Sequence, residues 1–459
     1  MNPTIFREYD IRGIADQDFD TEFAFTLGQA YGTYVVKQGK KRVSVGRDCR
    51  LTSEKYATAL RRGLCSTGLD VLDIGVCPTP LMYFSLYHYD LDGGIQVTGS
   101  HNPPEHNGFK ICIGKITIHG QEIQELRTLI EKKAFLAGTG REETAPIIVP
   151  YQEFVIQRFG RLARTIAVVI DAGNSTAGPV APQIFRALGC QVTELFCELD
   201  GHFPNHHPDP TLPDNLTHLI AKVKETGAEI GIAYDGDADR LGLIDRSGRI
   251  IWGDEMMVLF ARDILQRHPG AVIVSEVKCS QRLFDDIAQK GGTPIMWKAG
   301  HSLLKAKMRE TGALLGGEMS GHLFFADGYY GYDDAIYASC RVLDILGKTG
   351  KELPELLADL PPSCTTPEIR VDCPDELKFR IAEKVRDYFR EGYDIVDVDG
   401  VRVKFPDGWG LVRASNTQPI LVLRFEATTP EKLAEYRTLV EGVVEKMQKK
   451  LEAPPSSAV

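Results

Sequence analysis

The stretch of this chain whose residue types best suit covalent chemistry is Thr98–Lys110, TGSHNPPEHNGFK. It follows the apolar run GGIQV, which predicts a buried strand, and its glycine and prolines predict a sharp, stiff turn where that strand ends. Ser100 stands at the tip of this turn beside His101, and Lys110 adds a cation. An exposed serine near imidazole and ammonium groups can carry a phosphoryl or an acyl group. Acyl transfer is less favoured, because the nucleophile elbow G-x-S-x-G needs glycine where Asn102 stands.

The simpler alternative for this stretch is a surface loop whose serine caps a helix. Residue types alone do not decide between that loop and a nucleophile, so the other polar stretches of the chain must be weighed with it.

Three carboxylates at alternate positions, Asp235, Asp237 and Asp239, follow the apolar run EIGIAY. Because only Gly and Ala separate them, they can converge on one hard cation such as Mg²⁺, which would offset their mutual repulsion. An EF-hand is excluded, since Arg240 and Arg246 occupy the positions at which that loop needs glycine and glutamate. An acidic turn after a strand is the alternative.

Two loops offer groups that suit sugar hydroxyls and anions. GEMSGH places Glu318, Ser320 and His322 close to the backbone between glycines, and so provides acceptors, donors and a titratable base. WKAGH adds a cationic loop with Lys298 and His301. A loop with one satisfied histidine is the alternative for GEMSGH.

A fourth polar stretch, RASNTQ at residues 413–418, lies between two apolar runs near the end of the chain. A guanidinium fork with two hydroxyls, an amide and loop N–H groups can cradle a phosphate. A polar hairpin turn is the alternative.

Length and composition bound the kinds of protein that these loops can belong to. With 459 residues the chain is long enough for three or four domains. A net charge of −10 argues against binding nucleic acid or another polyanion, so a bound phosphate needs a local basic pocket. Ten cysteines without a C-x-x-C pair fit free thiols in a reducing compartment. The start MNPTIFREYDIRG has no apolar signal core, and no apolar run of about 18 residues occurs, so we expect a cytoplasmic protein without a membrane span.

The elements that must position these loops follow one repeated order. A β-branched run, a polar turn, a helix, a glycine and a second apolar run occur from VSVGRD to VLDIG, over Ala167–Phe196 and over Ala271–Gly300. Copies about one domain apart predict three related α/β domains, with ligands at the carboxyl ends of the strands. Asp20 is the expected N-cap of the first helix. Expected linkers are Thr139–Pro150, Ile251–Asp254 and Pro361–Pro367.

The last segment predicts a smaller α+β domain with an antiparallel sheet. A helix is expected over Asp375–Phe389, and Asp399-Gly400 in IVDVDGVRVKF is typical of a two-residue hairpin turn. The final helix is expected to begin at Thr429-Pro430 and to run to Leu451. The domain boundaries predicted in this way are 1–148, 149–253, 254–366 and 367–459.

Taken in order, TGSHNP, DGDADR, GEMSGH and RASNTQP resemble the α-D-phosphohexomutase family over essentially the whole chain. GEMSGH and RASNT resemble its bacterial phosphomannomutase/phosphoglucomutase branch, whereas phosphoglucosamine mutases would be expected to show GEQSGH and RPSGT. Gly99, His106 and Ala238 depart from the family's common residues. None of the three removes a functional side chain, so they affect only fine specificity. The resemblance implies mixed sheets in the three α/β domains and four domains around a central cleft.

The resemblance also implies roles for individual residues. Ser100 would carry a phosphoryl group in the resting enzyme, and its oxygen would join Asp235, Asp237 and Asp239 around one Mg²⁺. The other residues that the resemblance implies are Arg12, Lys110 and His322 beside the transferred phosphoryl group, Glu318 and Ser320 on the sugar hydroxyls, Arg413, Ser415, Asn416 and Thr417 around the phosphate, and Tyr9, Arg240, Lys298 and His301 as further substrate contacts.

The implied reaction interconverts hexose 1-phosphate and hexose 6-phosphate, of mannose, glucose or both, through a hexose 1,6-bisphosphate that also serves as activator. Such an enzyme has a small sugar phosphate as its partner, and we expect a monomer, with a dimer as the alternative. A phosphoglucosamine mutase of the same family is one rival. A haloacid-dehalogenase-like phosphatase with Asp235 as nucleophile is another, although its motif needs Thr or Val where Asp239 stands. A non-catalytic sugar-phosphate-binding protein is a third, but it would not need three clustered carboxylates.

Overall fold

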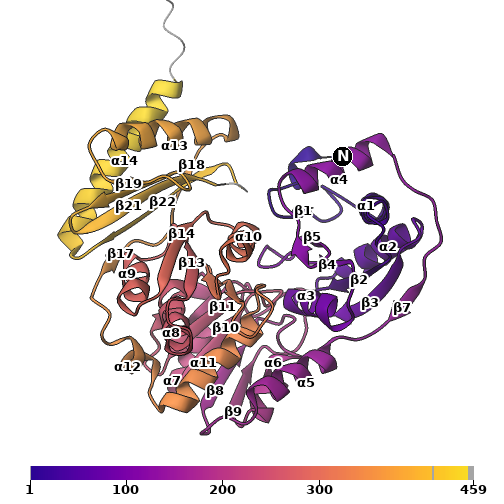
Figure 1. The fold of residues 1–459 in the computed structure, drawn as a ribbon, viewed down its shortest axis with the longest axis horizontal. Helices are drawn as coiled ribbons and strands as arrows, with labels where there is room; N and C mark the ends of the chain where they lie inside the picture. Colours follow the sequence, from indigo (N-terminus) through magenta and orange to yellow (C-terminus); the bar gives the residue numbers. More distant parts are fainter. Residues whose placement is uncertain (1, 416–417, 453–459) are drawn as a thin grey trace, which may run out of the picture.

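The computed structural model describes residues 2–415 and 418–452 and folds them into four β-sheets, each drawn from one continuous stretch of chain. Figure 1 shows the four sheets with their helices arranged in an arc, from the indigo first sheet to the yellow fourth. Within the described residues no helix is long and apolar enough to cross a membrane.

The first sheet carries the Ser100 loop. Its elements are η1 (Pro3–Ile5), β1 (Ile11–Ile14), α1 (Thr21–Val36), β2 (Arg42–Arg47), α2 (Ser53–Cys65), β3 (Asp70–Val76), α3 (Thr79–His88), β4 (Gly93–Val97), β5 (His106–Ile113), β6 (Ile116–Thr117), α4 (Gln121–Lys132) and β7 (Glu142–Thr144). The strand order is β1-β5-β4-β2-β3-β7, with β6 on β5. β2 is parallel to β3 and β4, whereas β5 is antiparallel to β4. The sheet is therefore mixed, as predicted.

The second sheet carries the three-carboxylate loop. Its elements are α5 (Ile148–Phe159), β8 (Ala167–Asp171), α6 (Ala181–Ala187), β9 (Gln191–Leu195), η2 (Pro213–Leu216), α7 (Thr217–Thr226), β10 (Ile230–Tyr234), β11 (Leu241–Asp245) and β12 (Ile250–Ile251). The order is β12-β11-β10-β8-β9, in which β8, β9 and β10 are parallel and β11 and β12 are antiparallel additions.

The third sheet carries the GEMSGH and WKAGH loops. Its elements are α8 (Gly253–Arg267), β13 (Val272–Glu276), α9 (Gln281–Gln289), β14 (Thr293–Trp297), α10 (His301–Thr311), β15 (Leu315–Gly317), β16 (Leu323–Phe325), α11 (Ala335–Thr349) and α12 (Leu353–Leu357). The order is β14-β13-β15-β16, and only β16 is antiparallel to its neighbour.

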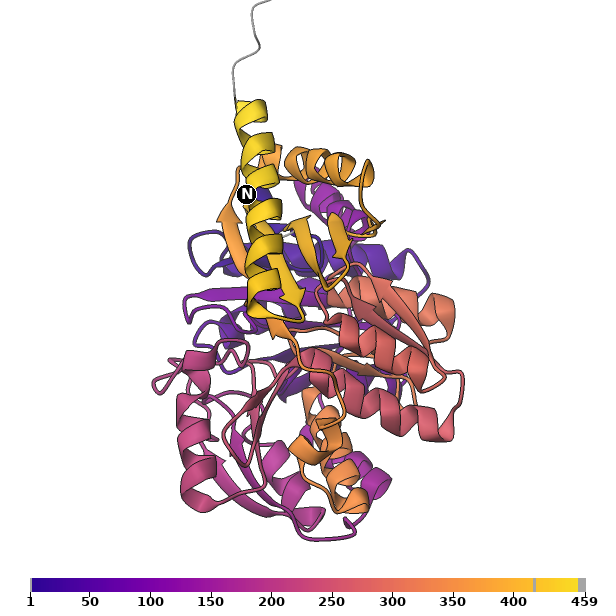
Figure 2. The same cartoon turned by 90° about the vertical axis from the view of Figure 1, so that its left-hand side faces the viewer.

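The fourth sheet is antiparallel, as predicted. Its elements are β17 (Cys364–Thr365), β18 (Ile369–Asp372), α13 (Asp375–Arg390), β19 (Ile395–Val396), β20 (Val401–Phe405), β21 (Gly408–Ala414), β22 (Ile420–Ala427) and α14 (Pro430–Glu452). The order is β17-β22-β21-β20-β19, with β18 also on β22. In the side view of Figure 2, α14 lies across one face of this sheet.

The apolar core is continuous through the first three sheets and separate in the fourth. One buried cluster runs from Leu72 and Phe84 through Ile232 to Leu343, and so joins α3 to the second and third sheets. The fourth sheet packs on α13 and α14 in a cluster of its own. Shared apolar burial of the first kind fixes the relative position of three sheets.

The predicted helix starts agree with the structure. Asp20 accepts a hydrogen bond from Phe23 N–H at 2.8 Å and caps α1. The oxygen Thr429 Oγ1 accepts from Lys432 N–H at 3.3 Å at the start of α14. Each of the three repeats predicted from the sequence forms a strand–helix–strand unit with parallel strands.

The three stretches predicted as linkers contain short regular elements. Thr139–Pro150 contains β7, which pairs with β3, and the first residues of α5. The sequence of β7 did not predict a strand, because β7 is an exposed edge strand with the polar sequence EET. Ile251–Asp254 holds the end of β12 and the start of α8, and Pro361–Pro367 holds β17, which pairs with β22.

The predicted two-residue turn at Asp399-Gly400 is also wrong, although the hairpin exists. Val396 pairs with Arg402, so the five residues 397–401 separate the paired positions. The two-residue turn of this sheet lies between Phe405 and Gly408. Gly400 keeps a left-handed φ of 73° within the longer loop.

Candidate active site

Ser100 follows β4 in a left-handed backbone conformation, with φ 49°, which non-glycine residues rarely adopt. The prediction of an exposed serine is wrong, because the residue is only 2% exposed. The second sheet covers it, since Ser100 Oγ donates a hydrogen bond to Asp235 Oδ2 at 2.9 Å. His101 Nδ1 lies 3.1 Å from the same oxygen. The sequence of the Ser100 loop alone could not predict this burial, because the residues that bury Ser100 belong to another domain.

Arg50 holds the Ser100 loop in place. Its guanidinium is buried and donates to the carbonyl oxygens of Ser100 at 2.7 Å, Asn102 at 2.6 Å, Pro103 at 2.6 Å and His106 at 3.0 Å. Arg50 also pairs with Asp48 at 3.2 Å. Sequence reasoning missed this residue, because nothing in GRDCR indicates that its side chain reaches a loop fifty residues later.

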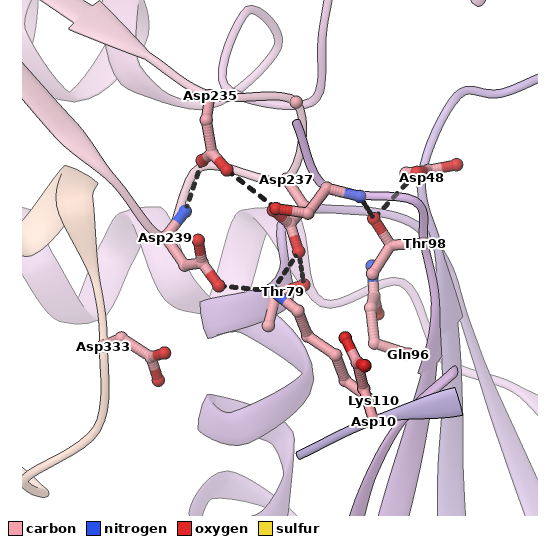
Figure 3. Close-up of polar contacts among 12 residues, drawn as sticks. Asp10, Asp48, Thr79, Gln96, Thr98, Lys110, Asp235, Asp237, Asp239 and Asp333 are labelled. Atoms are coloured by element: carbon pink, nitrogen blue, oxygen red, sulfur yellow. Dashed lines mark hydrogen bonds and ion pairs between the residues drawn. The ribbon is translucent and has the colours of Figure 1, made fainter. Parts of the chain in front are cut away.

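Asp48 holds the same Ser100 loop through its side-chain carboxylate. Its carboxylate accepts hydrogen bonds from Thr98 Oγ1 at 2.8 Å and from Gly99 N–H at 3.1 Å, and Figure 3 shows Asp48 beside Thr98. Asp48 and Arg50 together therefore fix both sides of the turn that presents Ser100.

Asp235, Asp237 and Asp239 lie in the loop after β10, and all three are fully buried (Figure 3). One carboxylate oxygen from each lies within 4.8 Å of the others, and Asp237 Oδ1 has no hydrogen-bond partner although it is buried. Burial and the neighbouring charges of Asp239 and Asp237 raise the pKa of Asp235 well above its usual value. A divalent cation bound by oxygen ligands fits this donor set.

Lys110 of β5 faces the three carboxylates. Its ammonium donates to Asp237 Oδ2 at 2.6 Å and also contacts Asp239. Burial would lower the pKa of Lys110, but the charges of Asp237 and Asp239 outweigh it and raise that pKa above its ordinary value. Thr79 Oγ1 of α3 donates to Asp237 Oδ2 as well, at 2.5 Å.

His322 of the GEMSGH loop joins the third sheet to the carboxylates. Its Nδ1 lies 2.8 Å from Glu318 Oε2 and its Nε2 lies 3.2 Å from Asp239 Oδ1. Burial would lower the pKa of His322, but Asp239 and Glu318 raise it to about 9, so the ring is a cation near neutral pH. Ser320 Oγ lies 3.1 Å from the same Nδ1. Arg240 Nε reaches His322 Nε2 at 3.4 Å.

The pKa of His101 is shifted in the opposite direction to that of His322. Burial, followed by the charges of Arg240 and Arg12, lowers the pKa of His101 well below its usual value, so the imidazole beside Ser100 is neutral. Arg12 donates to Asn102 Oδ1 at 3.1 Å and pairs with Asp10 at 2.6 Å, at the rim of the same loop. The sequence indicated that His101 is a polar neighbour of Ser100 but gave it no role.

The WKAGH loop between β14 and α10 connects three domains. Tyr9 Oη donates to Ala299 C=O at 3.1 Å, and Ala299 N–H donates to Asp399 Oδ2 at 3.1 Å. That same Asp399 oxygen accepts from Arg413 Nε at 2.8 Å. His301 lies with Nδ1 3.4 Å from Asp333 Oδ2. Arg413 is buried and lies at this loop rather than against Ser100.

The remaining predicted residues differ in what they contact. Lys298 is exposed. Ser415 Oγ accepts a hydrogen bond from Gln418 N–H at 3.1 Å within the loop between β21 and β22. Asn416 and Thr417 lie outside the described residues.

Two charged residues of the third domain were not predicted, the half-buried Lys278 and the fully buried Asp333. Lys278 lies 3.5 Å from Glu276 and 3.2 Å from Glu368. Asp333 lies beside His301 and pairs with Lys305 at 2.9 Å. An isolated K or D in a single sequence carries no signal of this kind.

A strained serine facing three buried carboxylates, with cations from three domains around it, can move a phosphoryl group, because that reaction needs positioning and charge neutralisation above all. The fold and the site define a multidomain α/β phosphotransferase. Models of the phosphoglucomutase/phosphomannomutase α/β/α domains I, II and III match residues 3–137, 150–248 and 252–364, and that of the C-terminal domain matches residues 368–442.

The chain belongs to the phosphoglucomutase/phosphomannomutase family. It is 46% identical over 452 residues to a phosphomannomutase/phosphoglucomutase of Pseudomonas putida, covering 98% of this chain and 97% of the relative. A phosphoglucomutase of Neisseria gonorrhoeae is 43% identical over 448 residues, 96% of each chain. The crystal structure of a phosphoglucomutase/phosphomannomutase family protein from Burkholderia thailandensis superimposes with a TM-score of 0.92 at 44% identity over 98% of both chains.

Proposed function

We propose that this enzyme interconverts hexose 1-phosphates and hexose 6-phosphates, with mannose and glucose as the sugars, through phospho-Ser100 and a hexose 1,6-bisphosphate. The observation that carries the proposal is the 2.9 Å contact between Ser100 Oγ and Asp235 of the buried carboxylate group. Relatives at 43–46% identity bear the names phosphomannomutase/phosphoglucomutase and phosphoglucomutase, which supports both sugars.

We propose Mg²⁺ as the ion that Asp235, Asp237 and Asp239 hold together with an oxygen on Ser100. The unpartnered Asp237 Oδ1 and the all-oxygen donor set support a hard cation. When bound, such an ion supplies positive charge that offsets the charge on the transferred phosphoryl group.

The transfer would proceed as follows. A hydroxyl oxygen of the sugar phosphate attacks the phosphorus on Ser100 and loses its proton to solvent. The bond from phosphorus to Oγ breaks, Oγ takes a proton from His101, and the sugar becomes a 1,6-bisphosphate. In the return step Oγ attacks the other phosphate, and the serine proton passes to His101 Nδ1, 3.1 Å away. The bond from that phosphorus to the sugar oxygen breaks, and the sugar oxygen takes a proton from solvent to become a hydroxyl. A phosphoryl dianion on Ser100 offsets the nearby charges of Arg12 and Arg240, so it favours the protonated His101 that returns this proton to Oγ.

The other loops would hold the sugar phosphate between the two steps. Glu318 and Ser320 are assigned to the sugar hydroxyls, and His322, Lys110 and Arg12 to the phosphoryl group in transit. Arg413, Ser415, Asn416 and Thr417 are assigned to the phosphate that is not reacting, with Tyr9, Arg240, Lys298 and His301 as further contacts. The bisphosphate then turns end for end, which lets both ends of the sugar meet one serine.

The test is a direct assay with a phosphorylation map. Mannose 1-phosphate and glucose 1-phosphate are mixed with the enzyme, Mg²⁺ and a trace of hexose 1,6-bisphosphate, and 6-phosphate formation is followed. We expect both to be converted, phosphoserine at residue 100, and a loss of several decades in turnover for Ser100→Ala. Thr128→Ala, which removes an exposed hydroxyl of α4 that bonds to Gln124 C=O, is the matched control for serine-specific loss.

The same experiment separates the rivals. Acyl phosphate at Asp235 would indicate a haloacid-dehalogenase-like phosphatase, and turnover of glucosamine 1-phosphate alone would indicate a phosphoglucosamine mutase. Absence of any phosphorylated residue and of turnover would indicate a binding protein. Retention of most activity by Ser100→Ala would refute the serine mechanism.

We also propose that the enzyme acts in the cytoplasm as a monomer. All ten cysteines are free thiols in the structure, which fits a reducing compartment. Light scattering at assay concentration tests the oligomeric state, and a mass twice that of the chain would indicate the dimer.

A further inference from the structure

A cavity lies between the first and third domains, and it is lined by residues of α3, α10 and the loop after β16. Its volume is about 310 Å³, at the lower end of the range for small-molecule sites. Tyr83 and Tyr87 of α3 form one wall, and Tyr330 and Tyr332 of the loop after β16 form another. No role in the proposed mutase reaction falls to this cavity.

The cavity wall is cationic although the protein is acidic. Lys115, Lys305 and Arg309 line it, and no aspartate or glutamate does, in a chain whose net charge is −10. Arg309 is exposed and forms no ion pair within the described part of the chain. The partner of Lys115 is Asp90, whose side chain is 91% exposed, and such a surface pair contributes little. Two cations are therefore available to a ligand.

The rest of the wall is apolar and aromatic. Leu86, Met308 and Ala313 line it together with the four tyrosines, of which Tyr87 and Tyr330 stack at 4.1 Å. Tyr83 is 2% exposed, and its hydroxyl is buried without a hydrogen-bond partner. The buried wall behind the cationic rim therefore presents mainly apolar surface to a ligand.

We propose that this cavity binds a small organic anion, with a phosphate or carboxylate group at Lys115 and Arg309 and a planar or apolar body against the tyrosines. A nucleoside monophosphate and an aromatic carboxylate are two sources of that chemistry. Each would place its charge at the open, cationic rim and its ring against the buried wall.

Lys305 connects this cavity to the candidate active site. It lines the cavity, lies over the Tyr83 ring at 4.6 Å and donates to Asp333 Oδ1 at 2.9 Å. Asp333 in turn lies with Asp239 and His322, whose ligand atoms fall within 4.8 Å of one another. A ligand body against the Tyr83 ring would lie beside Lys305 and disturb its contact with Asp333, so binding in the cavity is expected to change substrate affinity.

Calorimetric titration of the full-length protein, without substrate or Mg²⁺, tests the site. The probes are AMP and phenylpyruvate, with adenosine and inorganic phosphate as controls that carry only one half of the proposed chemistry. We expect AMP, phenylpyruvate or both to bind at least tenfold more tightly than either control. Arg309→Ala and Lys115→Ala should each weaken that binding about tenfold. Lys307→Ala is the matched control, because it removes the same charge from the same helix but does not line the cavity.

Three results would overturn the site. The first is that neither probe binds at millimolar concentration, and the second is that adenosine binds as tightly as AMP. The third is that binding is lost in Arg413→Ala and kept in Arg309→Ala, which would place the probe in the candidate active site. A kinetic measurement, which rests on the proposed mutase function, tests the coupling to the candidate active site. The bound probe should change the KM for sugar phosphate at least twofold in the wild type and should not change it in Arg309→Ala. Binding without any kinetic change would overturn the coupling through Lys305. Failure of the mutase assay would leave the binding titration unaffected.

Discussion

Ser100 combines a strained backbone with a hydroxyl that contacts both Asp235 and His101. A left-handed φ at a non-glycine residue is unfavourable and persists only where surrounding contacts hold it, as four hydrogen bonds from one guanidinium do here. Arg50 is thus a positioning residue, since it touches the carbonyls of the loop and not the serine hydroxyl.

Arg50→Lys should separate positioning from charge. Lysine keeps the charge but cannot reach four carbonyl oxygens and Asp48 together. We expect kcat to fall at least tenfold, with a smaller change in KM, and the free energy of unfolding to fall by about 1–3 kcal/mol. Steady-state kinetics and urea unfolding measure the two effects. Arg127→Lys on the exposed face of α4, where the partner is Glu131, is the control, and an unchanged kcat in Arg50→Lys would refute the role.

His322 should titrate well above the ordinary pKa of a histidine side chain. Its pKa is raised to about 9 between Asp239 and Glu318, from the ordinary 6.5. The resulting contribution to the free energy of unfolding is therefore complete below about pH 6.5 and is lost as the pH rises through about 9. NMR titration of the imidazole protons in the metal-free protein measures this pKa. Glu318→Gln should lower it, and Mg²⁺ should lower it because the ion shares the charge of Asp239. A value near 6.5 in the metal-free protein contradicts the geometry.

At the scale of elements, the carboxylate loop and the Ser100 loop meet backbone to backbone. An added Cβ at Gly236 would lie 2.3 Å from the Ser100 carbonyl oxygen, which cannot move without moving the strained turn. Glycine is therefore required at this position by the approach of another domain and not by its own φ.

Gly236→Ala should separate the two loops while the fold survives. We expect Mg²⁺ affinity and kcat/KM to fall together by at least tenfold, as measured by calorimetry and by the mutase assay. Ala238→Gly is the matched control: Ala238 has a φ of 56°, so glycine relieves strain there while removing one buried methyl group, and the net change should be small. Equal effects of the two substitutions would contradict the argument.

These elements also show what a single sequence can predict. Strand–helix–strand units, caps and polar turns follow from local chemistry, so the repeats, Asp20 and the loops at Ser100 and Asp235 were predicted correctly as elements. The burial of Ser100, the reach of Arg50 and the pair Asp333–Lys305 depend on contacts between distant segments. Edge strands such as β7 were missed because short polar strands lack hydrophobic alternation.

At the scale of the whole molecule, the apolar core joins three of the domains and leaves the fourth with a core of its own. The first three sheets share one apolar cluster, whereas the fourth has a separate core. The fourth sheet meets the third through a small apolar cluster of Val277, Trp409 and Leu411 and through polar groups. Arg402, fully buried, donates to the carbonyl oxygens of Val277 and Cys279 at 2.7 Å each, and Glu426 accepts from Ser280 Oγ at 3.0 Å. A junction with a small apolar cluster and many polar contacts permits relative movement of domains, so the fourth domain is the one expected to close over bound sugar phosphate.

Arg413→Ala should weaken substrate binding more than chemistry. Arg413 is held by Asp399, which also accepts a hydrogen bond from Ala299 N–H of the third domain, so its guanidinium lies where the fourth and third domains meet. Loss of a bidentate guanidinium costs about 1.5–3 kcal/mol, equivalent to a tenfold to hundredfold rise in KM. Ser100 should still be phosphorylated by bisphosphate at adequate concentration, because the reacting group lies in the first domain.

Calorimetry with mannose 1-phosphate and solution scattering check this prediction together. The wild type should compact when the ligand is added, and the variant should compact less, because the contact that would draw the fourth domain toward the ligand is gone. Arg437→Ala on α14, where the partner is Glu441, is the control for removing a cation from the same domain. If Arg413→Ala binds mannose 1-phosphate as tightly as the wild type, the phosphate is held elsewhere and residues 413–418 form only a turn between β21 and β22.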